Sequence, residues 1–295
     1  MNNSINISRF EKFDNDVIIV DGLWGSGKTL LTPIISSMED VEKQKIDYIY
    51  EYLCTLNWLK KIDSKSCEEL ISYYVDINQY DNIIGREINT KFGDDTSIFN
   101  NPKSLMYLKR MLFNKGVEIN NNYALLLMTH CIFAFSDPIF NALGSRLKFI
   151  EIVRHPLYMV QHWFNAYERF NVSTEFELCL DIPGPKVPWF AKDWSNEFKL
   201  LNNVEKSILS IIYLYKEIDK VILDDKKDFL ILSFESIIVS PSTNIDKLCS
   251  YLGREKPKNI TRVLTKQKIP RATISSGKGH SKYGFKSNKG LTDQE

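Results

Sequence analysis

Short apolar runs alternate with longer stretches of helical periodicity along most of this chain. The strand-like runs fall at residues 17–20, 45–50, 123–128, 149–153 and 229–234. Apolar positions recur with helical spacing over residues 30–38, 53–62, 67–77, 103–113, 156–170, 197–222 and 242–252. Strands that alternate with helices are typical of an α/β protein whose parallel sheet is covered by its crossover helices. We therefore predict a parallel sheet flanked by helices on both faces.

The boundaries of this pattern indicate one main domain. Residues 1–16 are polar and are expected to form an N-terminal arm. Residues 17–295 are expected to form a single α/β domain with a helical insertion at about 52–122. Two polar or proline-rich stretches, 93–102 and 181–194, are predicted to be loops, and the Gly-, Ser- and Lys-rich chain from Pro270 onward a loop or tail.

The first apolar run leads into a glycine-rich turn. Gly22, Gly27, Lys28 and Thr29 fill the pattern G-x-x-x-x-G-K-[ST], and an apolar helical stretch follows. Glycines let successive backbone N–H groups point into one concavity, the helix N-terminus adds partial positive charge, and Lys28 adds a full charge. A plain turn is the alternative, but the strand before it and the helix after it favour a phosphate-binding loop. The predicted sheet is thus of the P-loop type.

Polar residues follow each predicted strand at its C-terminal end. They are the loop 22–29, Glu51, the pair Thr129-His130, Arg154 and Glu235. Ligands of parallel sheets bind beyond the carboxyl ends of the strands. We therefore expect these residues to line one site.

Composition narrows the classes of function. The formal net charge is +1, so no overall field attracts nucleic acid or an anionic membrane. The five cysteines are scattered, which favours free thiols in a reducing compartment over disulfides or a zinc site. Neither a membrane-spanning stretch nor a signal-like apolar core is found. We expect a cytoplasmic protein without nucleic-acid or membrane partners, and its oligomeric state stays open.

Four segments, in this order along the chain, resemble those of the sulfotransferase family. Residues 25–31 (GSGKTLL) are similar to the 5′-phosphosulfate loop, and Met128-Thr129-His130 is similar to the Lys-Thr-His segment of cytosolic members. Residues 148–157 (KFIEIVRHPL) resemble the 3′-phosphate motif, a strand that ends in Arg-x-Pro. Residues 230–237 (LILSFESI), followed by 248–253, resemble the penultimate strand and a helix that ends in Leu-Gly. The match spans about residues 17–280.

The resemblance implies a donor, 3′-phosphoadenosine 5′-phosphosulfate (PAPS), with no required metal. It implies transfer of the sulfuryl group to a hydroxyl or amine of a small-molecule or carbohydrate acceptor. The 5′-phosphosulfate would lie on Gly25, Ser26, Gly27, Lys28 and Thr29. Lys28 would also be catalytic, because it stabilises charge that develops on the bridging oxygen. The family usually has Thr or Arg at this position and often a basic residue at that of Gly25, so Lys28 acts as the loop lysine from a shifted position.

The same resemblance assigns the 3′-phosphate to Arg154, whose guanidinium forms a bidentate fork that Lys does not provide. The family has a serine eight residues after this arginine, where this chain has His162. A later loop with Arg271, Lys278 and Gly279 resembles the segment that closes on the 3′-phosphate.

Two residues are candidates for the general base that deprotonates the acceptor. His130 matches the cytosolic members, and the pKa of a histidine suits neutral pH. Glu51 matches the place where carbohydrate- and protein-sulfating members carry a catalytic glutamate after the second strand. A hydrogen-bonded strand-end histidine and a cap of the next helix are the structural alternatives for these two residues. The choice between the two residues stays open here.

A nucleoside-triphosphate-dependent kinase is the alternative function. The complete G-K-T ending of the loop fits a kinase well, and the stretch from Gly22 to Thr29 is also similar to that of adenylylsulfate kinase. Phosphoryl-transfer P-loop enzymes use a strand that ends in Asp to hold Mg²⁺. The third, fourth and fifth strands predicted here end in Thr-His, Arg and Glu instead, which favours sulfuryl transfer.

Overall fold

A computed structural model describes residues 13–113, 123–170, 178–223 and 227–271. Its central element is a five-stranded sheet in the order β2-β3-β1-β4-β7, and every neighbouring pair of strands is parallel. The strands are β1 (Val17–Gly22), β2 (Val41–Ile46), β3 (Ala124–Met128), β4 (Leu147–Val153) and β7 (Phe229–Ser233). The predicted α/β fold with a parallel sheet is confirmed.

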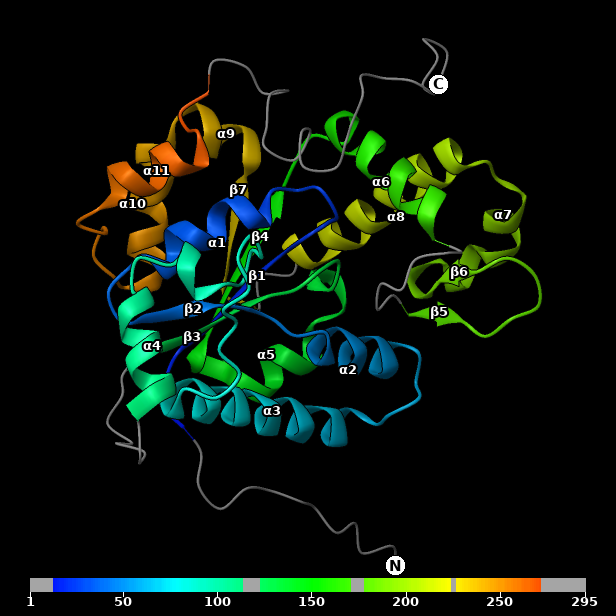
Figure 1. Cartoon of the computed structure of the whole chain (residues 1–295). Helices are drawn as coiled ribbons and strands as arrows, with labels where there is room; N and C mark the ends of the chain where they lie inside the picture. The colour runs from blue at the N-terminus through cyan, green and yellow to red at the C-terminus, as the bar shows by residue number, and fades with distance from the viewer. Residues whose placement is uncertain (1–12, 114–122, 171–177, 224–226, 272–295) are drawn as a thin grey trace, which may run out of the picture.

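Helices cover both faces of this sheet (Figure 1). One face packs against α1 (Lys28–Ser36), α9 (Phe234–Val239), α10 (Pro241–Leu252) and α11 (Ile260–Gln267). The opposite face packs against α2 (Ile49–Trp58), α3 (Ser64–Ile84), α5 (Asp137–Leu143), α6 (Leu157–Arg169) and α8 (Asn203–Ile222). Alternate residues of β1 enter the two cores, since Ile18 and Val20 face α1 whereas Val17 and Ile19 face the other layer.

Shorter elements complete the described chain. They are η1 (Ile98–Asn100), α4 (Ser104–Phe113), η2 (Phe133–Phe135), η3 (Gly144–Arg146), η4 (Trp189–Trp194), α7 (Ser195–Leu200) and the two-residue strands β5 (Cys179–Leu180) and β6 (Val187–Pro188). The helices α2, α3 and α4 lie in or beside the stretch expected to be a helical insertion. Among the described residues, no helix is long and apolar enough to cross a membrane.

The second strand lies earlier in the chain than the prediction of residues 45–50. It spans Val41–Ile46, and Glu51 lies in the first turn of α2 rather than at a strand end. The hydrophobic pattern placed this strand incorrectly because β2 is an edge strand whose polar side chains are buried against residues distant in the sequence. Glu42, for example, is fully buried and accepts from Arg110 Nη1 of α4 at 2.7 Å.

The helix predicted over residues 197–222 is two helices. Asn202 separates α7 from α8, and its side chain accepts from the backbone N–H groups of Val204 and Glu205 while Glu205 reaches back to the Asn202 N–H. This reciprocal capping starts a new helix in place of a continuous one. The loop predicted at 181–194 contains β6 and η4. The helices α5, α9 and α11 are not predicted by the sequence pattern.

The arm predicted at residues 1–16 is described only from residue 13. Its last residues are attached to the sheet and to α10's end, since the Asp16 carbonyl accepts from Leu125 N at 3.0 Å and its carboxylate pairs with Arg254 at 3.2 Å. Residues 1–12 lie outside the described residues. Gly253 terminates α10 in the left-handed conformation (φ 62°), which agrees with the helix expected over residues 242–252.

Candidate functional site

The predicted phosphate loop, residues 22–29, joins β1 to α1, and two of its glycines show why this residue type is needed there. Gly27 caps α1 with φ 109°, and a Cβ on this residue would lie 2.2 Å from the Phe234 ring. Gly25 has φ 83°, and a Cβ there would press on the His162 side chain at 3.1 Å. Both positions therefore need glycine for backbone conformation and for close approach by a neighbouring element.

Lys28 is buried and bends back over the end of β1. Its Nζ donates to the carbonyl oxygens of Gly22 at 2.5 Å and of Leu23 at 3.0 Å. These bonds use two of the three N–H groups of the ammonium and hold its charge inside the loop. The next side chain, Thr29, is exposed. Ser26 is fully buried, and its Oγ has no hydrogen-bond partner among the described residues.

Arg154 follows β4 and is attached to the phosphate loop. Its Nη1 donates to the Gly25 carbonyl at 2.9 Å, and its guanidinium lies 4.3 Å from the centre of the Phe234 ring. The Tyr215 hydroxyl of α8 fixes its backbone, accepting from Arg154 N at 3.0 Å and donating to Arg154 O at 2.6 Å. The Nε–H of this guanidinium is buried without a hydrogen-bond partner in the described structure.

Phe234 is a residue of this site that the sequence did not single out. It begins α9, and its ring lies against Gly27 and under the guanidinium of Arg154. A second guanidinium, that of Arg271, lies 5.8 Å from the centre of the same ring. The structure thus brings Arg154 and Arg271 together, whereas Lys278 and Gly279 lie outside the described residues. The neighbouring Glu235 braces the turn by accepting from His155 N at 3.0 Å.

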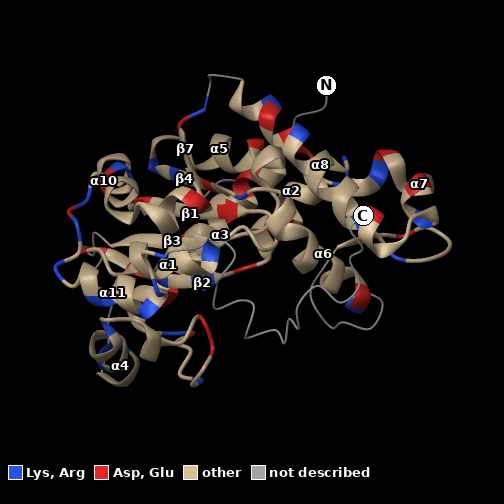
Figure 2. Cartoon of the chain, turned by 90° about the horizontal axis from the view of Figure 1, so that it is seen from above, with Lys and Arg blue, Asp and Glu red and all other residues tan. Residues whose placement is uncertain are grey.

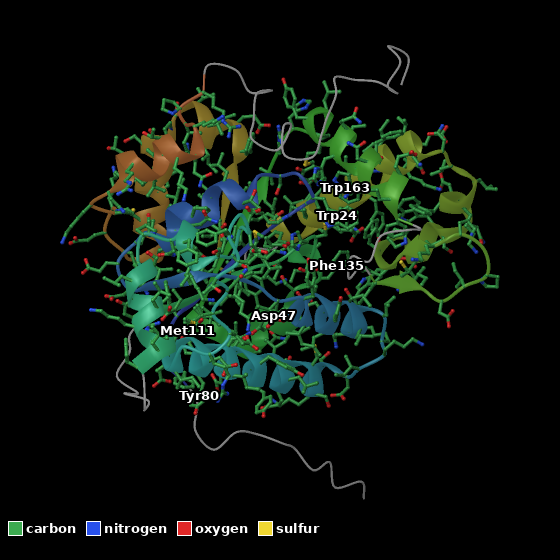
Figure 3. The ribbon with its side chains drawn as sticks, in the orientation of Figure 1. Trp24, Asp47, Tyr80, Met111, Phe135 and Trp163 are labelled. Atoms are coloured by element: carbon green, nitrogen blue, oxygen red, sulfur yellow. The ribbon has the colours of Figure 1, made fainter. Side chains whose placement is uncertain are left out.

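His162 and Trp163 of α6 hold the other side of the phosphate loop. His162 faces Gly25, and burial, reinforced by the charge of Lys28, lowers the pKa of its imidazole to about 4. Trp163 donates from Nε1 to the Trp24 carbonyl at 2.9 Å, and the centres of the two indole rings are 4.4 Å apart. Figure 3 shows these two tryptophans side by side. Helix α6 therefore fixes the loop, with a neutral imidazole beside it.

The two candidate bases are hydrogen-bonded to each other. Glu51 Oε1 lies 2.9 Å from His130 Nδ1, and both side chains are largely buried. Burial raises the pKa of Glu51 well above its usual range, and the nearby Asp21 carboxylate raises it further. The Tyr48 ring is stacked on His130 at 6.1 Å between centres. The pair therefore holds a proton to a higher pH than an exposed glutamate would.

Two buried acids beneath the loop were missed by the sequence analysis. Asp21 of β1 lies opposite Glu151 of β4 in the sheet, and both side chains are fully buried. Figure 2 shows acidic positions in the middle of the molecule beside these strands. Asp21 is well bonded, since it accepts from Thr129 Oγ1 at 3.0 Å and from the N–H groups of Ile132 and Phe133 at 2.9 and 2.8 Å. It thereby anchors the turn that carries His130.

Glu151 differs from Asp21 in having no hydrogen-bond partner for either oxygen within the described residues. Burial raises the pKa of its carboxyl well above the usual range, and Asp21 raises it further, while Lys28 opposes this shift. The signal that could have found it is a single acid inside the otherwise apolar strand of residues 149–153.

The site therefore has two halves at the carboxyl edge of the sheet. One half is a cationic cradle made of the phosphate loop, Lys28, Arg154 and Arg271. The other is the Glu51–His130 pair. Lys28 links the halves electrostatically, because its charge acts on Glu51, Glu151 and His162. Such an arrangement can bind a nucleotide with two anionic groups and accept a proton beside it.

Comparisons with known proteins give similarity at the level of structures alone. No protein-family model and no curated protein matches the sequence. The sulfotransferase domain of the curacin biosynthetic pathway is 11% identical, with a TM-score of 0.45 over 88% of this chain and 81% of that one. The sulfotransferase domain of the Synechococcus PCC 7002 olefin synthase is 12% identical, with a TM-score of 0.45 over 95% and 86%. Mouse sulfotransferase SULT7A1, complexed with PAP, is 12% identical, with a TM-score of 0.39 over 91% and 70%. At these values an activity for this chain has to be argued from its own residues.

Proposed function

We propose that this protein transfers a sulfuryl group from PAPS to a hydroxyl or amine of a small-molecule or carbohydrate acceptor. The observation that carries the proposal is the attachment of Arg154 to the phosphate loop at Gly25, 2.9 Å from Nη1 to the carbonyl oxygen. A loop for one anionic group and a guanidinium held beside it for a second suit a nucleotide with phosphates at both its 5′ and 3′ ends.

The chain's own groups supply the contacts that such a donor needs. Lys28 and the exposed Thr29 lie at the N-terminus of α1, where the backbone N–H groups and the helix dipole favour an anion. The Nε–H of Arg154 and the hydroxyl of Ser26 are buried polar groups without a hydrogen-bond partner among the described residues, and a bound anion is one group that would satisfy them. Arg271, beside the same ring as Arg154, adds a second cation for the 3′-phosphate.

The transfer step needs a proton acceptor on one side of the sulfur and charge stabilisation on the other. The acceptor oxygen or nitrogen forms a bond to sulfur and gives its proton to the Glu51–His130 pair. The bond between sulfur and the bridging oxygen breaks, and adenosine 3′,5′-bisphosphate leaves with the electron pair of that bond. Lys28 stabilises the charge that develops on this oxygen. In this scheme His130 takes the proton and Glu51 orients its ring through Nδ1.

A nucleoside-triphosphate-dependent kinase is the second candidate, favoured by the complete G-x-x-x-x-G-K-T pattern. The described strand ends argue against it. β3, β4 and β7 lead into Thr129-His130, Arg154 and Phe234-Glu235 rather than into an aspartate that would hold Mg²⁺. The edge strand β2 does lead into an aspartate, Asp47, but the carboxylate of Asp47 already accepts from Ile49 N and from Asn78 Nδ2.

Isothermal titration of the whole protein separates these two candidates. Adenosine 3′,5′-bisphosphate should bind at least about tenfold more tightly than ATP–Mg²⁺, because only the former places a phosphate against Arg154; that ratio corresponds to about 1.4 kcal/mol. Tighter binding of ATP–Mg²⁺ would favour the kinase and overturn the proposal.

A further inference from the structure

We propose that Asn78, on α3, is the positioning residue that holds the Glu51–His130 pair in register, and that the helical segment carrying it braces this half of the site. The inference rests on the proposed function for its catalytic meaning, but its structural content is independent of the donor. The side-chain hydrogen bonds of Asn78 go to Lys45, Asp47 and Tyr50 and not to either member of the pair. Asn78 acts on the two residues that flank the start of α2, the helix that presents Glu51.

Every polar atom of the Asn78 side chain is used. Its Nδ2 donates to Asp47 Oδ2 at 2.9 Å and to the Tyr50 hydroxyl at 2.7 Å, and its Oδ1 accepts from Lys45 Nζ. The two charged partners fix the orientation of the Asn78 amide. The Lys45 ammonium only donates, so it faces Oδ1, and the Asp47 carboxylate only accepts, so it faces Nδ2. Asn78 is itself buried, and so is its bond to Tyr50, whereas its bonds to Asp47 and Lys45 are partly buried.

The bonds from Asn78 to Asp47 and to Tyr50 hold the N-terminus of α2 at residues that lie before and after Tyr48 in the chain. Asp47 Oδ1 accepts from Ile49 N at 3.2 Å and so satisfies one of the first N–H groups of the helix. Figure 3 places Asp47 beside this end of α2. Tyr50 is fully buried and directly precedes Glu51. With Asp47 and Tyr50 tied to one amide, the first turn of α2 has a single position relative to the sheet.

Lys45, the third hydrogen-bond partner of Asn78, is itself held by an ion pair. Lys45 of β2 pairs with Glu87, just after α3, and lies 3.9 Å from Asp47. The network therefore connects an edge strand, α3 and the start of α2. Two side chains at this start of α2 contact His130: Glu51 Oε1 lies 2.9 Å from its Nδ1, and the Tyr48 ring is stacked on its imidazole. Loss of the amide leaves buried donors and acceptors unpaired, and a shift of α2 is the way to relieve them.

The test compares two substitutions on the same helix. Asn78→Leu removes the amide, and Asn78→Asp keeps its size but replaces both donors by an acceptor that faces Asp47. Gln79→Leu is the matched control, since Gln79 is equally buried but donates to the Tyr123 carbonyl, before β3 begins and at the opposite end of that strand from His130. A rescue variant, Asp47→Asn with Asn78→Asp, reverses the direction of the hydrogen bond.

The readout is the ¹⁵N chemical shift of His130 Nδ1 in the full-length protein, with Glu51→Ala as the unbonded reference. We expect both Asn78 variants to move this shift at least halfway to the reference, Gln79→Leu to leave it unchanged, and the rescue variant to restore it. Titration with adenosine 3′,5′-bisphosphate should change less than about twofold in all of them.

An unchanged His130 shift in Asn78→Leu and Asn78→Asp overturns the inference, whatever the nucleotide does. An equal shift in Gln79→Leu also overturns it, because the effect would then be general loosening of α3. Failure of the wild-type protein to bind adenosine 3′,5′-bisphosphate would refute the proposed function, and the His130 shift would still decide the role of Asn78.

Discussion

At the scale of single residues, the decisive feature is that Glu51 and His130 share one hydrogen bond. Taken separately, each was an equal candidate for the base. Together they form a unit, because a proton on one atom of the 2.9 Å contact excludes a second, and the titration of both groups becomes that of the pair. Burial and the nearby Asp21 carboxylate raise the pKa of Glu51, which keeps a proton in the pair toward neutral pH.

This pairing predicts the behaviour of variants. Glu51→Gln and His130→Gln should each lower single-turnover transfer from PAPS by about 100-fold, because proton removal contributes on this order. The double variant should lose little more than either single variant. Binding of adenosine 3′,5′-bisphosphate should stay within about twofold, since the phosphate cradle is untouched. Wild-type turnover in both single variants would show that the base lies elsewhere.

At the scale of elements, the sequence predicts those turns, strands and helix ends that are determined by neighbouring residues in the chain. The tight turn between β1 and α1 follows from the glycine pattern together with the apolar runs on either side of it, because Gly25 and Gly27 adopt positive φ and tolerate close neighbours. The boundaries of β3 and α10 followed in the same way from a buried run and from a glycine cap. The residues expected at strand ends do meet at one edge, as the topology of a parallel sheet requires.

The elements that the sequence misplaced depend on distant partners. β2 contains Glu42 and Lys43 and therefore looks exposed in the sequence, but α4 buries both residues. Arg110 donates to the Glu42 carboxylate, and the Tyr107 hydroxyl accepts from the backbone N–H of Lys43. No local pattern contains that information. Asp21 and Glu151 are similar cases, since a single acid within an apolar strand reveals burial only when the neighbouring strand is known. The Glu51–His130 contact joins residues 79 apart in the chain.

At the scale of the whole molecule, the buried Glu151 ties stability to pH. Its carboxyl is fully buried without a hydrogen bond in the described structure, and burial raises its folded-state pKa above the ordinary value near 4.5. The folded protein then binds more protons than the unfolded chain between these two pKa values. The free energy of unfolding must fall as pH rises across that interval, and then level off.

Glu151→Gln removes this titration while keeping the shape of the side chain. Urea unfolding from pH 4 to 8.5 should show that the stability of the variant, relative to wild type, rises from about pH 4.5 upward. Below that pH the difference in stability between the two proteins should be constant. Parallel stability curves at all pH values would mean that Glu151 ionises alike in both states. Asp21→Asn is no substitute as a test, because Asp21 accepts three hydrogen bonds.

The central claim for the molecule is that Arg154 and the phosphate loop together bind a nucleotide phosphorylated at both its 3′ and 5′ positions. The direct measurement is calorimetric titration of wild type and Arg154→Ala, each with adenosine 3′,5′-bisphosphate and with adenosine 5′-phosphate. The control is Arg254→Ala, since the guanidinium of Arg254 pairs with Asp16. We predict that Arg154→Ala weakens the bisphosphate by about 100-fold, near 2.7 kcal/mol, and the monophosphate by less than about threefold. Equal losses for both nucleotides would contradict the claim.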